Sequence, residues 1–266
     1  MCLILFAYQY HPHFPLVLAA NRDEFYQRPT QAAAFWEDHP ELLAGKDLRE
    51  GGTWMGITAQ GRFAGLTNYR NLKATHPHGK SRGWLVRDFL IQRRSPEQFV
   101  HDLAPAASHY NPFNLLVGEF DPQQSHLYYY SNWTQSLQRL QPGIHGLSNH
   151  LLDTPWPKVR HGKQQLEQLL KTPSSPPIEA LFDLLEHDEV FPDDQLPDTG
   201  VGLEMERLLS PVFIQSPTYG TRASTLLFID WEGTVTFHEK VLHPETREPT
   251  YSQYQFRLKS VEDKSG

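Results

Sequence analysis

The chain is patterned as short apolar runs separated by polar turns that contain glycine or proline. Runs of this kind, rich in aromatic and branched aliphatic residues, predict strands joined mainly as hairpins. Segment 21–53 carries Pro29, Pro40 and the pair Gly51-Gly52 instead, so it is expected to be a loop. The predicted strands are residues 2–10, 15–20, 54–58, 62–67, 113–120, 126–131, 222–230, 234–240 and about 251–257.

Helices are predicted where apolar residues recur at helical spacing. Ser81 is expected to cap the first of them, and Ser95-Pro96 is expected to form the cap and first turn of the second. The acidic, proline-rich stretch 188–200 predicts a surface loop. The predicted helices are residues 81–92, 96–103, 156–171 and 177–187.

The order of these elements indicates the fold class. Strands, helices, strands, helices and strands follow one another without the regular strand–helix alternation of a parallel sheet. Because hairpins predominate, antiparallel sheets are favoured, and two such sheets face to face with helices outside fit the pattern. No shift in composition marks a boundary, so residues 1–266 are predicted to form a single α+β domain.

Composition narrows the class of protein further. The 266 residues are 39% hydrophobic, with six Trp and fifteen Phe, which is enough to fill a core. A single cysteine excludes a disulfide framework, and a net charge of −7 argues against nucleic acid as a partner. No apolar stretch reaches roughly 18 residues, and the start lacks the basic region of a signal peptide. We therefore expect a soluble cytoplasmic protein without membrane insertion.

That single cysteine, Cys2, is the most informative residue. Removal of Met1, which a small second residue such as Cys usually permits, would leave a thiol and a free α-amine on the same residue. The amine has an unperturbed pKa of about 8 and can act as a built-in general base for the thiol. The alternative interpretation is that Cys2 is a small buried residue that opens the first strand.

Four polar residues, Asn21-Arg22-Asp23-Glu24, follow the second predicted strand directly. In an extended backbone Asn21 and Asp23 share one face, which the hairpin would bring near Cys2. An acid there could hold or orient a protonated α-amine. A solvated turn is the alternative for this tetrapeptide.

Three further polar residues are candidates for the site. Asn68 follows 62–67 and Asn149 follows 145–148, and both are neutral donors of the kind used in oxyanion holes, although such residues also cap and turn chains. Arg222 opens a late strand and is either a site cation or one half of a surface ion pair.

Several motifs together resemble the NRDE family, the family of the transport-and-Golgi-organisation proteins. They are MCLILF at the start, LAANRDEFYQRP (18–29), EGGTWMGIT (50–58), LTNYRN (66–71), GLSNHLLDTPWPKV (146–159) and YGTRASTLLFID (219–230). The resemblance covers nearly the whole chain. It implies an N-terminal-nucleophile hydrolase fold, a four-layer αββα sandwich of two antiparallel sheets flanked by helices. The choloylglycine hydrolases and penicillin V acylases are similar to this family.

The resemblance to these hydrolases also implies site residues. Cys2 matches their nucleophile, and Asn21 and Asp23 match an Asn-x-Asp whose aspartate contacts the nucleophile. The arginine that precedes this motif in the hydrolases is Ala20 here. Arg22 is expected on the opposite face of the extended chain, so the thiolate is expected to lack a positive neighbour that lowers its pKa.

The remaining matches extend the candidate site. Asn68 and Asn149 fall at the two site asparagines of the hydrolases, and Arg222 falls at their late active-site arginine. The candidate catalytic residues are thus Cys2, Asp23, Asn68, Asn149 and Arg222. The candidate binding residues are Asn21, Arg22, Glu24, Tyr69 and Thr221.

Two functions follow from the resemblance. The first is a cysteine hydrolase of a non-peptide C–N amide bond in a small acylated molecule, with Asn68 or Asn149 stabilising the oxyanion. The second is a carrier that uses the same cleft for haem or acyl-CoA. No cofactor is required, haem enters only as a candidate ligand, and no metal site is predicted. The hydrolase interpretation places the first strand centrally in a sheet, with Cys2 near Asp23 in a cleft.

Overall fold

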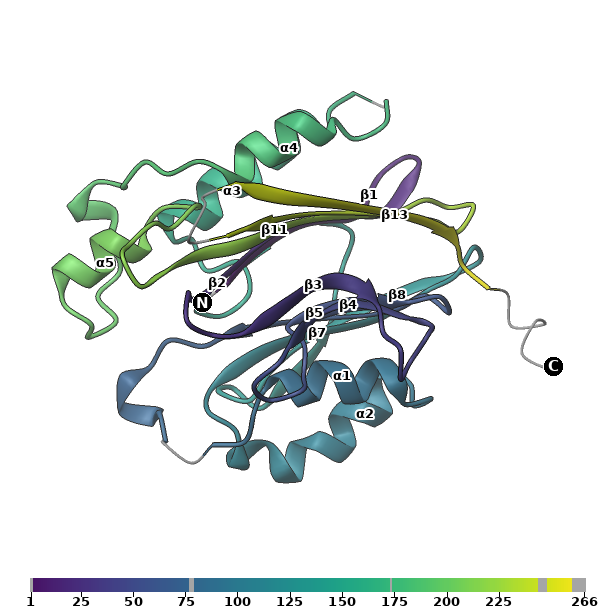
Figure 1. Ribbon diagram of the computed structural model, residues 1–266, viewed down its shortest axis with the longest axis horizontal. Coiled ribbons are helices and arrows are strands. Elements are labelled where there is room, and N and C mark those ends of the chain that lie inside the picture. The colour runs from purple at the N-terminus through teal and green to yellow at the C-terminus, as the bar shows by residue number, and fades with distance from the viewer. Residues whose placement is uncertain (1, 77–78, 173, 244–247, 260–266) are drawn as a thin grey trace.

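The described part of the chain, residues 2–76, 79–172, 174–243 and 248–259 of a computed structural model, is built on two antiparallel sheets (Figure 1). Met1, whose removal the sequence predicts, lies outside the described residues. In order across the first sheet, the strands are β10 (Gly143–Leu147), β1 (Cys2–His11), β2 (Phe14–Phe25), β11 (Tyr219–Ile229), β12 (Thr234–Leu242) and β13 (Pro249–Arg257). Across the second they are β3 (Thr30–Phe35), β4 (Leu42–Asp47), β5 (Met55–Thr58), β6 (Arg62–Asn68), β7 (Phe113–Phe120), β8 (Ser125–Ser131) and β9 (Ser136–Arg139).

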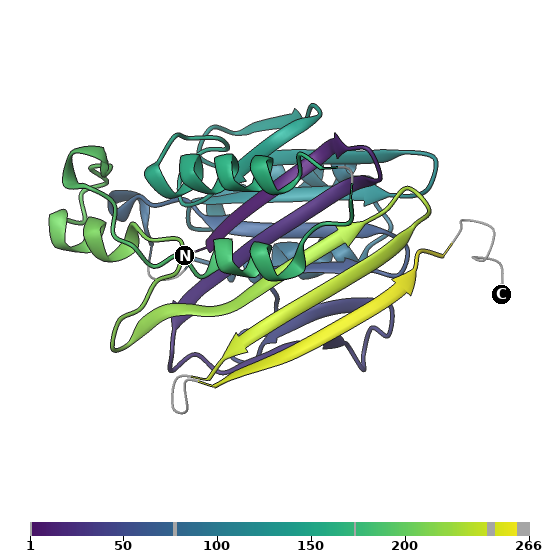
Figure 2. The same cartoon turned by 90° about the horizontal axis from the view of Figure 1, so that it is seen from above.

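Helices cover the outer face of each sheet, which gives the order helix, sheet, sheet, helix (Figures 1 and 2). The second sheet carries α1 (Gly83–Ile91) and α2 (Pro96–Leu103), and the first carries α3 (Pro157–Leu169) and α4 (Ile178–Leu185). The predicted α+β, four-layer αββα sandwich is confirmed. The shorter helices are α5 (Leu203–Leu209) and the 3₁₀ turns η1 (Leu72–Ala74), η2 (Ala104–His109) and η3 (Asp193–Gln195).

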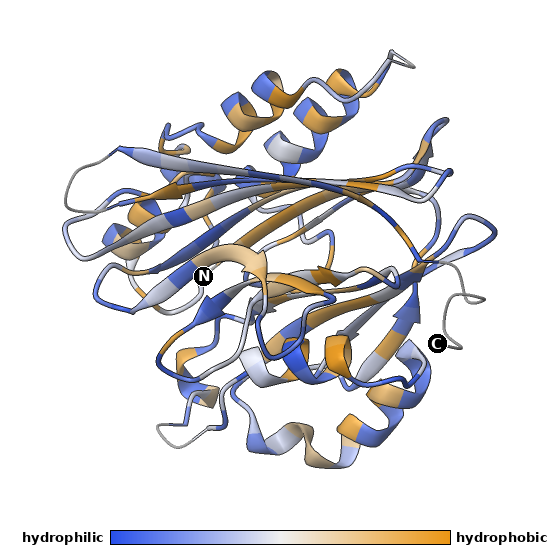
Figure 3. Cartoon of the chain, turned by 45° about the vertical axis from the view of Figure 1, so that its right-hand side comes forward, coloured by the Kyte–Doolittle hydropathy of each residue, from blue (hydrophilic) through white to orange (hydrophobic). Residues whose placement is uncertain are grey.

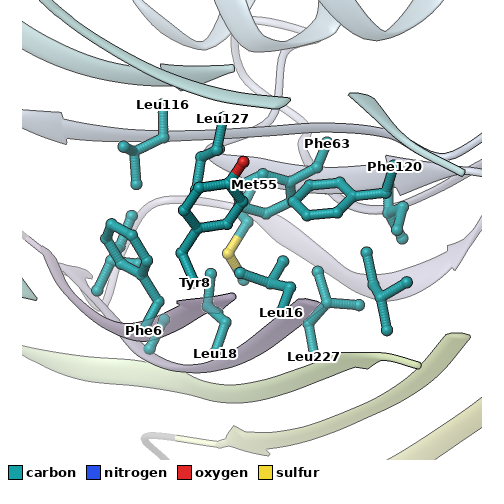
Figure 4. Close-up of a cluster of buried hydrophobic side chains, with 14 of the residues drawn as sticks. Phe6, Tyr8, Leu16, Leu18, Met55, Phe63, Leu116, Phe120, Leu127 and Leu227 are labelled. Carbon is teal, nitrogen blue, oxygen red and sulfur yellow. The ribbon is translucent and has the colours of Figure 1, made fainter. Parts of the chain in front are cut away.

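Large apolar side chains fill the space between the two sheets (Figure 4). Phe120 of β7 packs edge-on against Phe63 and Tyr8, with ring centroids 6.4 and 6.5 Å apart. The Tyr8 hydroxyl donates to the Ser125 carbonyl at 2.8 Å, so its one polar atom is satisfied. This core fixes the two sheets face to face and thereby fixes the ends of their strands relative to one another.

Alternate residues of β1 face different layers. Ile4 and Phe6 point into the core between the sheets, whereas Leu3 and Leu5 pack beneath the helices. This is the two-residue period of a strand that is buried on both faces. The helices are apolar on one side only, and Figure 3 shows hydrophobic and hydrophilic positions alternating along them.

The expectation of a loop over 21–53 was wrong. Strand β2 continues to Phe25, and β3 and β4 pair with each other and join the second sheet through β5. Alanine and glycine, which have low strand propensity, occupy the middle of β3 and β4, so burial of Ala33 and Ala44 against neighbouring elements defines them instead. The exposed strand β9 and the short helix α5 also escaped prediction.

The two predicted helix caps had opposite outcomes. Ser95 caps α2 as predicted, in a reciprocal capping box with Gln98. Ser81 does not cap α1, because Arg82 occupies the N-cap position and makes no capping bond with its side chain. The first strand is not central either: β1 lies second from the edge, between β10 and β2.

Candidate functional site

Cys2 and Arg22 face each other across the β1–β2 hairpin. Residues directly opposite each other in an antiparallel pair carry their side chains on the same face. Cys2 lies two residues before Ile4, which points into the core between the sheets, so the thiol is on this inner face too. Cys2 is only 8% exposed.

A cavity with a volume of about 290 Å³ opens beside Cys2. It is bounded by the ends of strands from both sheets and by the segment that leads into α1. Among the residues that line it are Cys2, Arg22, Asp23, Glu24, Asn68, Arg82, Arg222 and Glu239. Four predicted site residues are not among the residues that line it, namely Asn21, Tyr69, Asn149 and Thr221.

The expectation that the thiol lacks a positive neighbour was wrong. Burial and the charge of Asp23 raise the pKa of the Cys2 thiol, whereas the charge of Arg22 and a hydrogen bond from the Asp23 backbone act in the opposite direction. Arg22 is therefore positioned to favour the thiolate. The error came from the assumption that Cys2 shares a face with Asp23, when the hairpin register pairs it with Arg22.

Asp23 points to the other face of the sheet. Its Oδ1 accepts a hydrogen bond from the Thr221 hydroxyl at 2.7 Å, and the residue is 2% exposed. Burial raises the pKa of the Asp23 carboxyl, and nearby Lys158 and the Thr221 bond lower it. Asp23 is thus adjacent to Cys2 along the hairpin, and Thr221 acts on Asp23 rather than on the cavity.

Asn21 serves the packing of the helix layer. Its Nδ2 donates to the carbonyls of Leu185 and Val212 at 2.8 and 3.0 Å, and its Oδ1 accepts from Ser224 at 2.7 Å. These bonds satisfy both ends of the Asn21 side-chain amide with partners inside the protein, away from the cavity. Glu24, in contrast, lines the cavity and lies 3.8 Å from the Arg22 guanidinium.

The two predicted asparagines have different environments. Asn68 lines the cavity at the end of β6. Asn149 is fully buried, and its Nδ2 donates to the Asn68 carbonyl at 3.0 Å, so it holds the strand end that carries Asn68. Tyr69 turns away from the cavity, toward His150, with an Oη–Nε2 distance of 3.0 Å, and stacks on Trp133.

Arg222 lies at a β-bulge, where the pairing of β11 with β2 shifts by one residue. The residue lines the cavity, but its Nη1 donates to the carbonyls of Phe25, Tyr26 and Arg28 at 3.0 to 3.2 Å. Arg222 therefore supports the chain between β2 and β3, which forms one wall of the cavity.

Charged residues that the sequence analysis did not select lie close to Asp23. Arg70 and Glu206 form a buried ion pair at 2.7 Å, and Lys158 donates to the Leu209 carbonyl at 2.9 Å. Burial lowers the pKa of Lys158 to about 8, and Asp23 opposes this shift. Arg70 and Lys158 fall inside the family motifs, which was the available signal, but nothing in the sequence indicated Glu206.

Glu239 is the second overlooked residue. It is 3% exposed, lines the cavity, and accepts a hydrogen bond from the Ala33 backbone at 2.6 Å, which joins the two sheets. Burial raises its pKa to about 7. A glutamate in the apolar pattern of β12 was the sequence signal for a buried acid.

Over the described ranges of the chain, no group of three or more His, Cys, Asp or Glu is arranged to hold a metal ion. No described helix is long and apolar enough to cross a membrane.

The architecture is that of the N-terminal-nucleophile hydrolase fold. A mutant conjugated bile acid hydrolase from Clostridium perfringens has this architecture, with a TM-score of 0.51, 8% sequence identity and 97% of each chain covered. At this identity the likeness concerns the fold alone.

The chain belongs to the Transport and Golgi organisation 2 family, whose model matches residues 1–244. It is 36% identical to the human Transport and Golgi organization protein 2 homolog, over 98% of this chain and all of the relative. It is 31% identical to Transport and Golgi organization protein 2 of Drosophila melanogaster, over 91% of this chain and 92% of the relative. The family resemblance inferred from the sequence motifs is confirmed.

Glu239 predicts a pH dependence of stability. Its pKa rises from 4.5 to about 7 on folding, so the folded protein binds more protons between these values. The free energy of unfolding should fall as pH rises through this window, by about 3 kcal/mol, and then level off. Urea unfolding at pH 5 and pH 8 measures this change. Between the two pH values, the free energy of unfolding should fall less for Glu239→Gln than for wild type. Parallel changes in wild type, Glu239→Gln and the exposed control Glu232→Gln would contradict the prediction.

Arg22 predicts the reactivity of the thiol. Arg22→Gln removes the positive charge that favours the thiolate, so the pKa of Cys2 should rise further. Alkylation by iodoacetamide at pH 7.5 should slow by up to about tenfold, with the midpoint of the pH–rate profile shifted upward. Arg87→Gln, on α1 and outside the cavity lining, should react like wild type. An unchanged profile in Arg22→Gln would show that Arg22 does not act on the thiol.

Proposed function

We propose that the protein is a cysteine N-terminal-nucleophile hydrolase that cleaves a non-peptide C–N amide bond in a small acylated molecule. The observation that carries the proposal is the placement of the Cys2 thiol at the cavity, opposite Arg22 and next to the Asp23 backbone. A thiol beside a cation in a concave site is the environment expected of a nucleophile.

The proposed reaction begins with the mature N-terminus, after Met1 has been removed. The α-amine of Cys2 accepts the thiol proton, and Sγ attacks the carbonyl carbon of the substrate. Collapse of the tetrahedral intermediate breaks the C–N bond, and the ammonium returns the proton to the leaving nitrogen. Water then attacks the thioester, which releases the acid and restores the thiol.

The surrounding residues have separate roles in this proposal. Arg22 favours the thiolate, and Asp23, held by Thr221, orients the protonated amine. Asn68 lines the cavity and is the better placed donor to the oxyanion, while Asn149 positions it through the Asn68 carbonyl. Arg222 supports the cavity wall.

The size and polarity of the cavity favour a small substrate with a charged group over haem. At about 290 Å³ the cavity lies at the lower limit of ligand sites, and 11 of the 26 described residues that line it are charged. A carrier of haem needs a larger apolar surface. The carrier function nevertheless makes a distinct prediction that the same experiment can test.

The test compares wild type from which Met1 has been removed, as verified by intact mass, with Cys2→Ser and with a form that retains Met1. Retained Met1 converts the amine into an amide nitrogen that cannot accept a proton at neutral pH. In a screen of small N-acyl amides, both altered forms should lose at least about a thousandfold in kcat/KM, since nucleophile and base act as a unit.

Titration of haem and of octanoyl-CoA into the same three proteins supplies the control. Tight binding that persists in all three, without hydrolysis of any amide by wild type, would overturn the hydrolase in favour of the carrier. Hydrolysis that disappears in both altered forms would exclude a carrier that has no catalytic activity.

A further inference from the structure

Six described residues that line the cavity are basic, and several of them are already compensated. They are Arg22, Arg28, Lys46, Lys80, Arg82 and Arg222. Arg28 is held by Asp47 through two bonds of 2.6 and 3.1 Å, and Lys46 pairs with Asp38 at 3.5 Å. Arg222 donates from Nη1 to three backbone carbonyls and from Nη2 to the Thr30 hydroxyl, and only its buried Nε has no hydrogen-bond partner among the described residues.

Arg82 and Lys80 have fewer protein partners than the other four. Arg22, Arg28 and Lys46 each have a carboxylate partner, at 3.8, 2.6 and 3.5 Å. Arg222 has hydrogen bonds from both of its Nη atoms. Among the residues that the structure describes, Arg82 and Lys80 form no ion pair with a carboxylate. Arg82 is fixed by one bond, from its Nη1 to the Pro112 carbonyl at 3.1 Å, which leaves most of its five N–H donors for the cavity. Burial lowers the pKa of Arg82, and its proximity to Cys2 and Glu24 opposes this, which places it near the nucleophile.

The chain that carries these two residues forms a close-fitted wall. Residues 79–83 all line the cavity, and the segment ends at the start of α1. Gly52 and Gly83 touch so closely that a Cβ on Gly52 would lie 2.6 Å from the Gly83 carbonyl carbon. The indole of Trp84 donates to the Glu50 carbonyl, which ties α1 to the same loop. The backbone that carries Arg82 is thus held in position by the protein itself.

The lining carries more basic than acidic residues. Against six basic residues stand five acidic ones, which are Asp23, Glu24, Asp47, Glu50 and Glu239. The Asp23 carboxyl faces the helix layer and burial raises the pKa of Glu239 to about 7, so the cavity has an excess of positive charge near neutral pH. A guanidinium without a carboxylate partner is suited to bind a planar carboxylate through two parallel N–H bonds.

We propose that Arg82, assisted by Lys80, is a subsite for an anionic group of the acyl amide substrate, and that this group is a carboxylate close to the scissile bond. The proposal rests on the hydrolase function proposed above and names its substrate class. It assigns substrate specificity to residues 79–83, the wall that precedes α1. Arg222 is not the specificity residue, because its Nη1 binds the carbonyls of the β2–β3 connection.

The experiment measures octanoate release from three matched substrates: N-octanoylglycine, neutral N-octanoylglycinamide and N-octanoylaminomethylphosphonate. Wild type should prefer the carboxylate to the neutral amide by at least about tenfold in kcat/KM. Arg82→Gln should lower kcat/KM for the carboxylate by about 10- to 100-fold, mainly through KM, and change the neutral amide less than about twofold. Arg82→Lys keeps the positive charge but loses the pair of parallel N–H donors. Its kcat/KM for the carboxylate substrate should lie between those of wild type and Arg82→Gln.

Arg87→Gln is the matched control, because Arg87 lies on α1 outside the cavity lining and contacts Asp88. Its kinetics should equal those of wild type with every substrate. Equal loss on the charged and neutral substrates in Arg82→Gln, or no preference in wild type, would overturn the subsite. A preference for the phosphonate would assign the subsite to a phosphate-type anion and overturn the carboxylate.

Calorimetric binding of N-octanoylglycine to Cys2→Ser separates this proposal from the proposed function. Binding that weakens at least about tenfold in Cys2→Ser/Arg82→Gln supports the subsite even if wild type hydrolyses none of the substrates. Hydrolysis by wild type that is insensitive to Arg82 would retain the hydrolase and reject the subsite. Failure of Cys2→Ser to bind the acid at millimolar concentration would also reject it.

Discussion

The register of the β1–β2 hairpin determines what the site can do. It sets Cys2 opposite Arg22 on the face between the sheets, and leaves Asp23 on the face toward the helices. A slip of one residue would exchange these faces for every side chain of the hairpin. Because β1 is apolar on both faces, contacts at particular positions fix the register. A slip would break the bond from the Tyr8 hydroxyl to the Ser125 carbonyl and would move Leu5 away from Gly162, whose missing side chain makes room for it.

The site therefore occupies both faces of one strand end. On the inner face a polar cavity holds the thiol and Arg22, with Glu239 buried in its wall. On the outer face the Asp23 carboxyl is buried near Lys158 and next to the Arg70–Glu206 ion pair. Buried charges persist only when partners compensate them, so this second cluster is what keeps an acid beside the N-terminus.

The sequence predicts those elements that are defined by the pattern of apolar and polar residues within the element itself. Hairpins with regular apolar runs and the Ser95 capping box were found, whereas β3 and β4 were missed because packing partners distant in sequence define them. The candidate residues that line the cavity were largely found through motifs. The face to which Arg22 points could not be predicted, because it depends on the register of the hairpin. The hydrogen bonds of Arg222 to backbone carbonyls could not be predicted either, because they depend on a β-bulge.

The central claim is that Cys2 acts as a nucleophile that uses its own α-amine as the base. Incubation with a β-lactone that carries an alkyl chain, followed by intact mass and peptide mapping, tests it most directly. The account predicts one probe equivalent, bound as a thioester to Cys2, in protein that lacks Met1, and almost none in protein that retains it. Equal labelling of both forms, or labelling at another residue while the Cys2 thiol remains free, would contradict the account.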